Sequence, residues 1–106
     1  LAEFNDVKMG IPPGMTKEGT LWLVDQGVKL MGIDAIGFDP PVGFMFKRQK
    51  YWEAHRVMRE REYYHIENLA NLDLLPKPFG FTVSAFPAFF RGATAAPIRA
   101  VAIIEE

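Results

Sequence analysis

The spacing of leucine and valine in the first third of the chain predicts a helix followed closely by a strand. Hydrophobic residues recur at helical spacing over residues 16–26. Thr16 is a suitable N-cap, and Gly27 stands where a helix commonly ends in a left-handed conformation. Residues 28–33 form a short, largely apolar segment, as expected of a strand. A helix, one glycine and a strand in this order are typical of a layered α/β domain.

A second helix is predicted over residues 50–62, where apolar positions again recur at helical spacing. Tyr51, His55 and Met58 share one face, and charged residues occupy the others. His55 is therefore expected to point toward the protein. The residues alone favour a core histidine that is satisfied by a hydrogen bond.

The stretch "YYHIENL" is predicted as a short strand. Its alternation places His65 and Glu67 on one side of the strand. A glutamate on the inner face of a strand is costly unless a cation, an arginine or several donors pair with it. Glu67 therefore requires such a partner.

Three further stretches complete the pattern. Residues 35–50 hold glycines, two adjacent prolines and aromatic residues, so we predict a long loop there, with "KRQK" as a solvated helix start. Residues 79–87 and 96–106 are predicted strands, and the second is apolar on both faces, which is typical of a buried central strand. Such a hairpin is expected to be covered, and a second copy of the chain is one candidate.

Length and composition describe one globular domain over residues 1–106 and argue against several function classes. The net charge of −1 argues against electrostatic binding of nucleic acid or an anionic membrane. No apolar run approaches the ~20 residues that span a bilayer, and the first residues lack a signal-peptide pattern. The lack of cysteine excludes disulfides and is compatible with the expected cytoplasmic location.

The candidate chemistry rests on His55, His65 and Glu67, because imidazoles and carboxylates bind metals or move protons. Asp34 follows a predicted strand, where sites of α/β sheets collect, although a turn-capping role is equally compatible with that position. The motifs G-x-G-x-x-G, H-E-x-x-H and G-x-S-x-G do not occur. From the residues alone, the chain is a small α/β domain with an unexplained His/Glu pair.

Three segments, in order, resemble the C-terminal half of the cyclase family of metal-dependent hydrolases, the family of bacterial kynurenine formamidase and isatin hydrolase. "GMTKEGTLWLVDQGVKLMGIDA" is similar to the helix and "G-V-x-L-x-G-I-D" strand of that family. "AHRVM…IENLANLDLLP" is similar to its "H-R-x-L…I-x-E-x-L-x-N-L-x-x-L-P" segment. "GFTVSAFPAFFRGATAAPIRAVAI" is similar to its closing hairpin.

The resemblance implies a portion of a swivelling β/β/α-type domain, with two main helices packed on a mixed sheet. It implies hydrolysis of an amide, formamide or cyclic amide with zinc or manganese. His55 and Glu67, twelve residues apart, match the metal ligands of the C-terminal half, and Asp34 matches a strand-end aspartate near the site. His65 matches no role and is expected beside the ligands or on the surface. The expected wall for a planar substrate, with core or subunit packing as an equal alternative, is formed by Phe38, Phe44 and Phe46.

The N-terminal H-x-G-T-H-x-D-x-P-x-H motif of the family does not occur in this sequence. The resemblance therefore implies that the chain supplies part of a site for a small-molecule substrate. A missing N-terminal segment or a second subunit would supply the rest, and a homo-oligomer is expected. The alternative is a non-catalytic cyclase-like module that acts in protein association.

Overall fold

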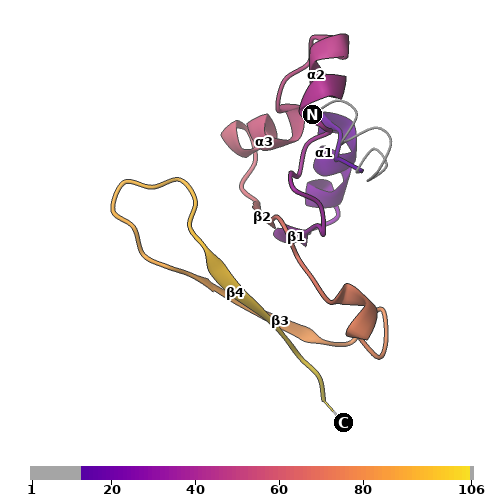
Figure 1. Ribbon diagram of the computed structural model, residues 1–106, viewed down its shortest axis with the longest axis vertical. Coiled ribbons are helices and arrows are strands. Elements are labelled where there is room, and N and C mark those ends of the chain that lie inside the picture. Colours follow the sequence, from indigo (N-terminus) through magenta and orange to yellow (C-terminus); the bar gives the residue numbers. More distant parts are fainter. Residues whose placement is uncertain (1–12, 106) are drawn as a thin grey trace. The chain divides into compact units, whose positions relative to one another are not determined.

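The structure is a computed structural model that describes residues 13–105 (Figure 1). The chain divides into two compact units, Leu1–Ala70 and Asn71–Glu106. The single domain expected over residues 1–106 stays a prediction. Helices and strands occur together in the described residues, which confirms the mixed α/β composition.

The first helix is confirmed almost to the residue. Helix α1 spans Lys17–Asp25, and the Thr16 hydroxyl accepts a hydrogen bond from the backbone N–H of Gly19 at 3.0 Å. Gly27 follows with φ of +91°, the left-handed conformation that glycine adopts without steric cost. Because these signals are local, the sequence was sufficient to predict them.

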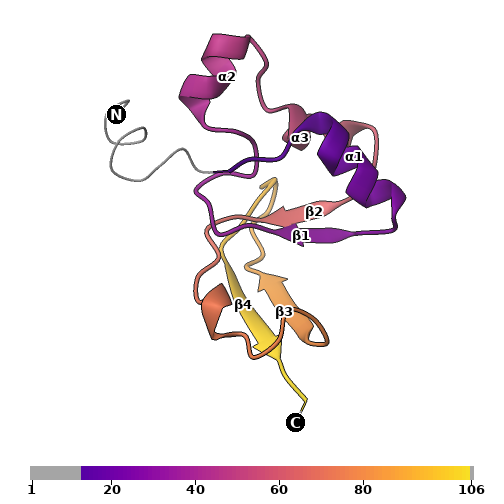
Figure 2. The ribbon, with the colours of Figure 1, turned by 90° about the vertical axis from the view of Figure 1, so that its right-hand side faces the viewer.

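Strands β1 (Leu30–Gly32) and β2 (Tyr64–Ile66) form a parallel pair in which Met31 is opposite His65. Figure 2 shows α1 and α3 on the same side of this pair. The core of the first unit lies between them and consists of Val24, Met31, Phe38, Ala54, Val57 and Tyr63. The histidine-bearing strand is therefore held directly against the core.

The prediction of a long loop over residues 35–50 is wrong, because helix α2 occupies Val42–Arg48. Pro41 is its N-cap, and proline is well suited to the start of a helix, where no backbone N–H is required. The basic Lys47 and Arg48 lie in its last turn, where positive charge suits the helix dipole. "KRQK" therefore ends a helix and does not begin one.

The helix predicted over residues 50–62 is much shorter in the structure. Helix α3 spans only Glu53–Arg56, and the 3₁₀ turn η2 follows at Val57–Arg59. Trp52 precedes α3 in the left-handed region with φ of 49°, so the preceding residues cannot continue the helix. The tighter winding of η2 leaves Met58 40% exposed, and its predicted inward position is wrong.

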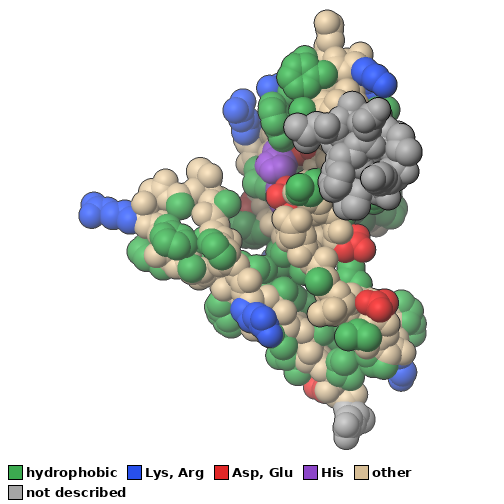
Figure 3. Space-filling model, in the orientation of Figure 1, with side chains coloured by type: hydrophobic (Ala, Val, Ile, Leu, Met, Phe, Trp, Pro, Cys, Tyr) green, Lys and Arg blue, Asp and Glu red, His purple; other side chains and the backbone are tan. Residues whose placement is uncertain are grey.

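The second unit holds the 3₁₀ turn η3 (Leu72–Leu74) and the antiparallel strands β3 (Thr82–Pro87) and β4 (Ile98–Ile103). The predicted hairpin is confirmed. Within residues 13–105, however, the sheets are one parallel and one antiparallel pair rather than a single mixed sheet. The prediction that β4 is buried is wrong for this chain. Figure 3 shows hydrophobic side chains at its surface, and those exposed in the hairpin unit include Val83, Phe86, Phe89, Val101 and Ile103.

Every helix within residues 13–105 is too short or too polar to reach across a bilayer.

Candidate metal centre

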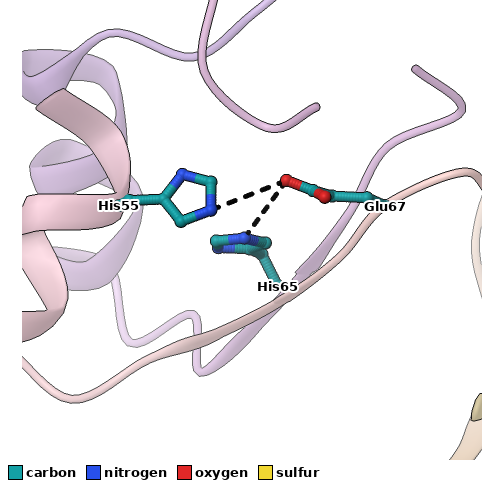
Figure 4. A group of neighbouring side chains, drawn as sticks. All are labelled: His55, His65 and Glu67. Carbon is teal, nitrogen blue, oxygen red and sulfur yellow. Dashed lines mark ion pairs between the residues drawn. The ribbon is translucent and has the colours of Figure 1, made fainter. Parts of the chain in front are cut away.

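Three donor groups come together beside the parallel strand pair. His55 lies on α3 and His65 on β2, and Glu67 is the residue just beyond the end of β2 (Figure 4). One ligand atom of each lies within 4.8 Å of the others. The strand alternation that placed His65 and Glu67 on one side is confirmed, and α3 brings His55 to the same point.

Asp39 orients His55, although the sequence pattern did not single it out. Its side chain is 4% exposed, and its Oδ1 accepts a hydrogen bond from the Ala54 N–H at 2.8 Å. Its Oδ2 accepts one from the His55 N–H at 3.0 Å and also contacts His55 Nδ1. A carboxylate is a hydrogen-bond acceptor, so it favours a proton on Nδ1 and leaves Nε2 with its lone pair.

The carboxylate of Glu67 faces both imidazoles. Its Oε1 accepts a hydrogen bond from the Phe38 backbone N–H at 2.8 Å. The same oxygen lies 3.7 Å from His55 Nε2 and 3.5 Å from His65 Nε2. Both separations exceed the ordinary N–H···O length of about 2.7–3.2 Å. They match the ~3.4 Å edge of a tetrahedron whose ligands lie about 2.0–2.1 Å from zinc.

These donors fit a divalent cation on chemical grounds as well. The Asp39 contact directs the His55 Nε2 lone pair at a carboxylate oxygen, so two acceptors face each other. Such a pair is stable only with a proton or a cation between its members. Neutral imidazole and carboxylate are ligands of zinc and manganese.

His65 is the most enclosed donor, with a side chain that is 7% exposed. Its ring stacks on Phe38 at 4.4 Å between centroids and meets the His55 ring edge-on at 4.4 Å. Burial, together with the neighbouring His55, lowers the pKa of His65, although the Glu67 and Asp39 charges act in the opposite direction. Lowering favours the neutral form, which is the form that binds metals.

Tyr63 supports the helix that carries His55. Its buried hydroxyl donates a hydrogen bond to the Ala54 carbonyl at 2.7 Å. Burial, with the charge of Asp39 adding to it, raises the pKa of Tyr63 to about 12. The phenol therefore remains a neutral donor at neutral pH.

A cavity of about 320 Å³ adjoins the cluster, near the lower end of the roughly 300–1,000 Å³ typical of small-molecule sites. Its polar lining includes Asp39, His55 and Glu67. Its apolar lining comprises Pro13, Ile36, Pro40, Pro41, Val42, Met45 and Trp52. A small ligand in this cavity would therefore meet the polar cluster on one side and apolar groups on the other.

The other residues that were predicted for the site do not line the cavity. Phe38 is in the core, where its backbone N–H supports Glu67. Phe44 and Phe46 are exposed and do not line this cavity, and Phe46 instead packs edge-on against Tyr51. Asp34 is exposed and also lies outside the cavity lining.

The signal for Asp39 was present but weak. It follows the predicted strand by a few residues and precedes two prolines, a context that equally describes a turn. His65 was recognised as a group of the right chemistry, and its buried place beside Glu67 excludes the surface position. Aliphatic and aromatic walls such as Ile36 and Trp52 left no sequence signal, because hydrophobic residues in loops do not distinguish a pocket from ordinary packing.

Fold and site together define an α/β protein with a His–His–Glu cluster that is suited to a divalent metal. The Cyclase family, described as "Putative cyclase", matches residues 2–40, a stretch that includes Asp39 and ends before His55. The kynurenine formamidase of Bordetella avium (strain 197N) is 35% identical over 80 residues, or 76% of this chain. The chain is therefore similar to the cyclase family over its first part and to kynurenine formamidase over most of its length.

The chain spans about a third (34%) of the length of that curated relative. No solved structure matches the chain significantly.

Proposed function

We propose that the protein takes part in the hydrolysis of a small amide, formamide or cyclic amide, with a divalent metal held in part by His55 and Glu67. The observation that carries this proposal is the 3.7 Å separation between His55 Nε2 and Glu67 Oε1, two residues that line a small cavity. The similarity to a relative named kynurenine formamidase supports the reaction class.

The residues have distinct roles in this proposal. Asp39 keeps a proton on His55 Nδ1, so that Nε2 remains a donor to metal. Glu67 supplies negative charge, and the hydrogen bond from the Phe38 N–H holds in place Oε1, the oxygen that would bind the metal. A divalent ion bound there would polarise a carbonyl and lower the pKa of its bound water.

The cavity suits a small substrate with a flat or apolar part. Ile36, Met45 and Trp52 would bury that part and exclude water around it, while the polar end lies against His55 and Glu67. Burial of apolar surface contributes binding free energy of about 25 cal/mol per Å². This arrangement would place the scissile group beside the donors.

Several features of the proposal reach beyond the described residues. A catalytic zinc site commonly has three protein ligands and an open position for water. We propose that the centre is completed by a further segment or a second subunit, in a cytoplasmic homo-oligomer. The fold would be part of a swivelling β/β/α-type domain, and zinc or manganese the metal.

The proposal is tested by metal content and aryl formamide hydrolysis of the chain together with any protein that co-purifies with it. Stoichiometric metal and activity should both be lost in His55→Ala. Asp73→Asn is the matched control, because that carboxylate is exposed in the second unit. A metal-free preparation that remains inactive with added zinc or manganese would refute the proposal.

The exposed hairpin favours a second candidate, a cyclase-like module that acts in protein association. Phe86 and Phe89 of the hairpin unit are 83% and 94% exposed, which is unusual for large aromatic side chains without a partner. Such a module would self-associate or bind a partner without holding metal. The metal measurement above separates the two candidates.

A further inference from the structure

We propose that His65 is a third metal ligand, so that this chain by itself supplies a His–His–Glu donor set. The proposal rests on the proposed function in one respect, namely that His55 and Glu67 bind a divalent cation. It adds a residue to which the family resemblance gives no role. The chain would then supply three protein ligands by itself, and the further segment or second subunit would complete the active site around them.

The distances place His65 on equal terms with His55. His65 Nε2 lies 3.5 Å from Glu67 Oε1, and His55 Nε2 lies 3.7 Å from the same oxygen. Both values are close to the ~3.4 Å expected between two tetrahedral zinc ligands. All three donors lie within 4.8 Å of one another, so modest side-chain adjustment would bring them around one ion.

The surroundings of His65 are costly for a residue that only packs. Its Nδ1 is buried and has no hydrogen-bond partner among the described residues. Burying a polar atom without a partner costs about 1–3 kcal/mol, a cost that an aliphatic side chain at this β2 position would not incur. A metal bond from Nε2 would leave Nδ1 without a partner, but it would give the imidazole at this position a function that an aliphatic side chain could not supply.

The position of His65 relative to the cavity fits the role of an inner ligand. His55 and Glu67 line the cavity, whereas His65 does not. Its ring is held between Phe38 and the edge of His55, which restricts its orientation. A third ligand from the buried side would leave the cavity side of the ion for water and substrate.

The informative variant is His65→Phe in the full 106-residue chain. Phenylalanine keeps a planar ring against Phe38 but offers no nitrogen, so packing is preserved while the ligand is lost. Tyr64→Ala is the matched control, because Tyr64 is the neighbouring residue of β2 and its side chain points outward. The chain is stripped with a chelator, and Zn²⁺ and then Co²⁺ are titrated by calorimetry.

We expect His65→Phe to lower the Zn²⁺ affinity at least tenfold, while Tyr64→Ala stays within twofold of the original chain. Equal affinity in His65→Phe and the original chain would overturn the role of His65 and leave the metal proposal standing. Failure of the original chain itself to bind Zn²⁺ or Co²⁺ would overturn this inference and, if metal is also absent with co-purified protein, the proposed function.

A second measurement does not depend on folding of the variant. The sequence has two histidines, so the Co²⁺-loaded original chain should show two hyperfine-shifted imidazole N–H signals in its proton NMR spectrum. A single signal, assigned to His55 by its loss in His55→Ala, would overturn the proposal.

Discussion

The replacement Asp39→Asn tests whether the orientation of His55 controls metal binding. Asp39 accepts hydrogen bonds from two backbone N–H groups through different oxygens, and its Oδ2 also contacts His55 Nδ1. Asparagine has nearly the same shape but one acceptor oxygen. If that oxygen occupies the Oδ2 position, the amide nitrogen faces the Ala54 N–H, and two donors meet in a buried place.

The expected magnitude follows from these contacts. One buried N–H without an acceptor costs about 1–3 kcal/mol of unfolding free energy. In addition, a neutral amide oxygen holds the His55 N–H less strongly than a carboxylate does, because charge-assisted hydrogen bonds are about twice as strong. Loss of such an outer partner typically lowers metal affinity about 10–100-fold, or about 1.4–2.8 kcal/mol.

Two assays separate these effects. Calorimetric titration with Zn²⁺ gives the affinity, and urea unfolding of the metal-free chain gives the stability. Asp73→Asn, an exposed carboxylate in the second unit, should change neither. A variant that loses stability but binds Zn²⁺ within twofold of the original chain would refute the reasoning, because Asp39 would then serve the helix alone.

Four further results are expected. Gly14→Ala should destabilise the chain by about 1–3 kcal/mol in urea unfolding, because the new Cβ would lie 2.3 Å from the backbone nitrogen of Pro40. Gly43→Ala in α2, with open space around it, should instead stabilise by about 0.5–1 kcal/mol, and the reverse order of these two would contradict the packing. Tyr63→Phe should cost about 0.5–1.5 kcal/mol in the same assay, because one buried hydrogen bond is lost, and an unchanged midpoint would argue against that bond. Chelation should lower the thermal midpoint of the metal-loaded chain but not that of His55→Ala, and equal shifts in both would indicate a metal bound elsewhere.

The parts of the fold that the sequence predicted are those with local causes. Thr16 and Gly27 mark the ends of α1 through their own hydrogen bonding and backbone freedom. The alternation of β2 sets the directions of His65 and Glu67 within three residues. Prediction of these features required no knowledge of the tertiary structure.

The features that the sequence missed depend on distant contacts. Gln49 and Trp52 adopt positive φ although neither is glycine, so the residue types did not predict the break between α2 and α3. Met45 accounts for part of it, because its sulfur accepts a hydrogen bond from the Trp52 N–H at 3.2 Å. The apolar pattern of β4 predicts a covered strand, but its residues are largely exposed in this chain, and a pattern does not say which surface would cover them.

The same contrast between local signals and distant contacts explains why only part of the site could be predicted from the sequence. His55 and Glu67 are recognisable by chemistry, but their usefulness depends on Asp39, which lies sixteen residues before His55. This carboxylate accepts two N–H groups from the first turn of α3, a helix of four residues that is too short to be stable alone. The same Oδ2 also contacts the imidazole. The formation of α3 and the orientation of His55 are therefore coupled, so any change that displaces Asp39 should weaken the helix and, if the proposed site holds metal, its metal affinity together.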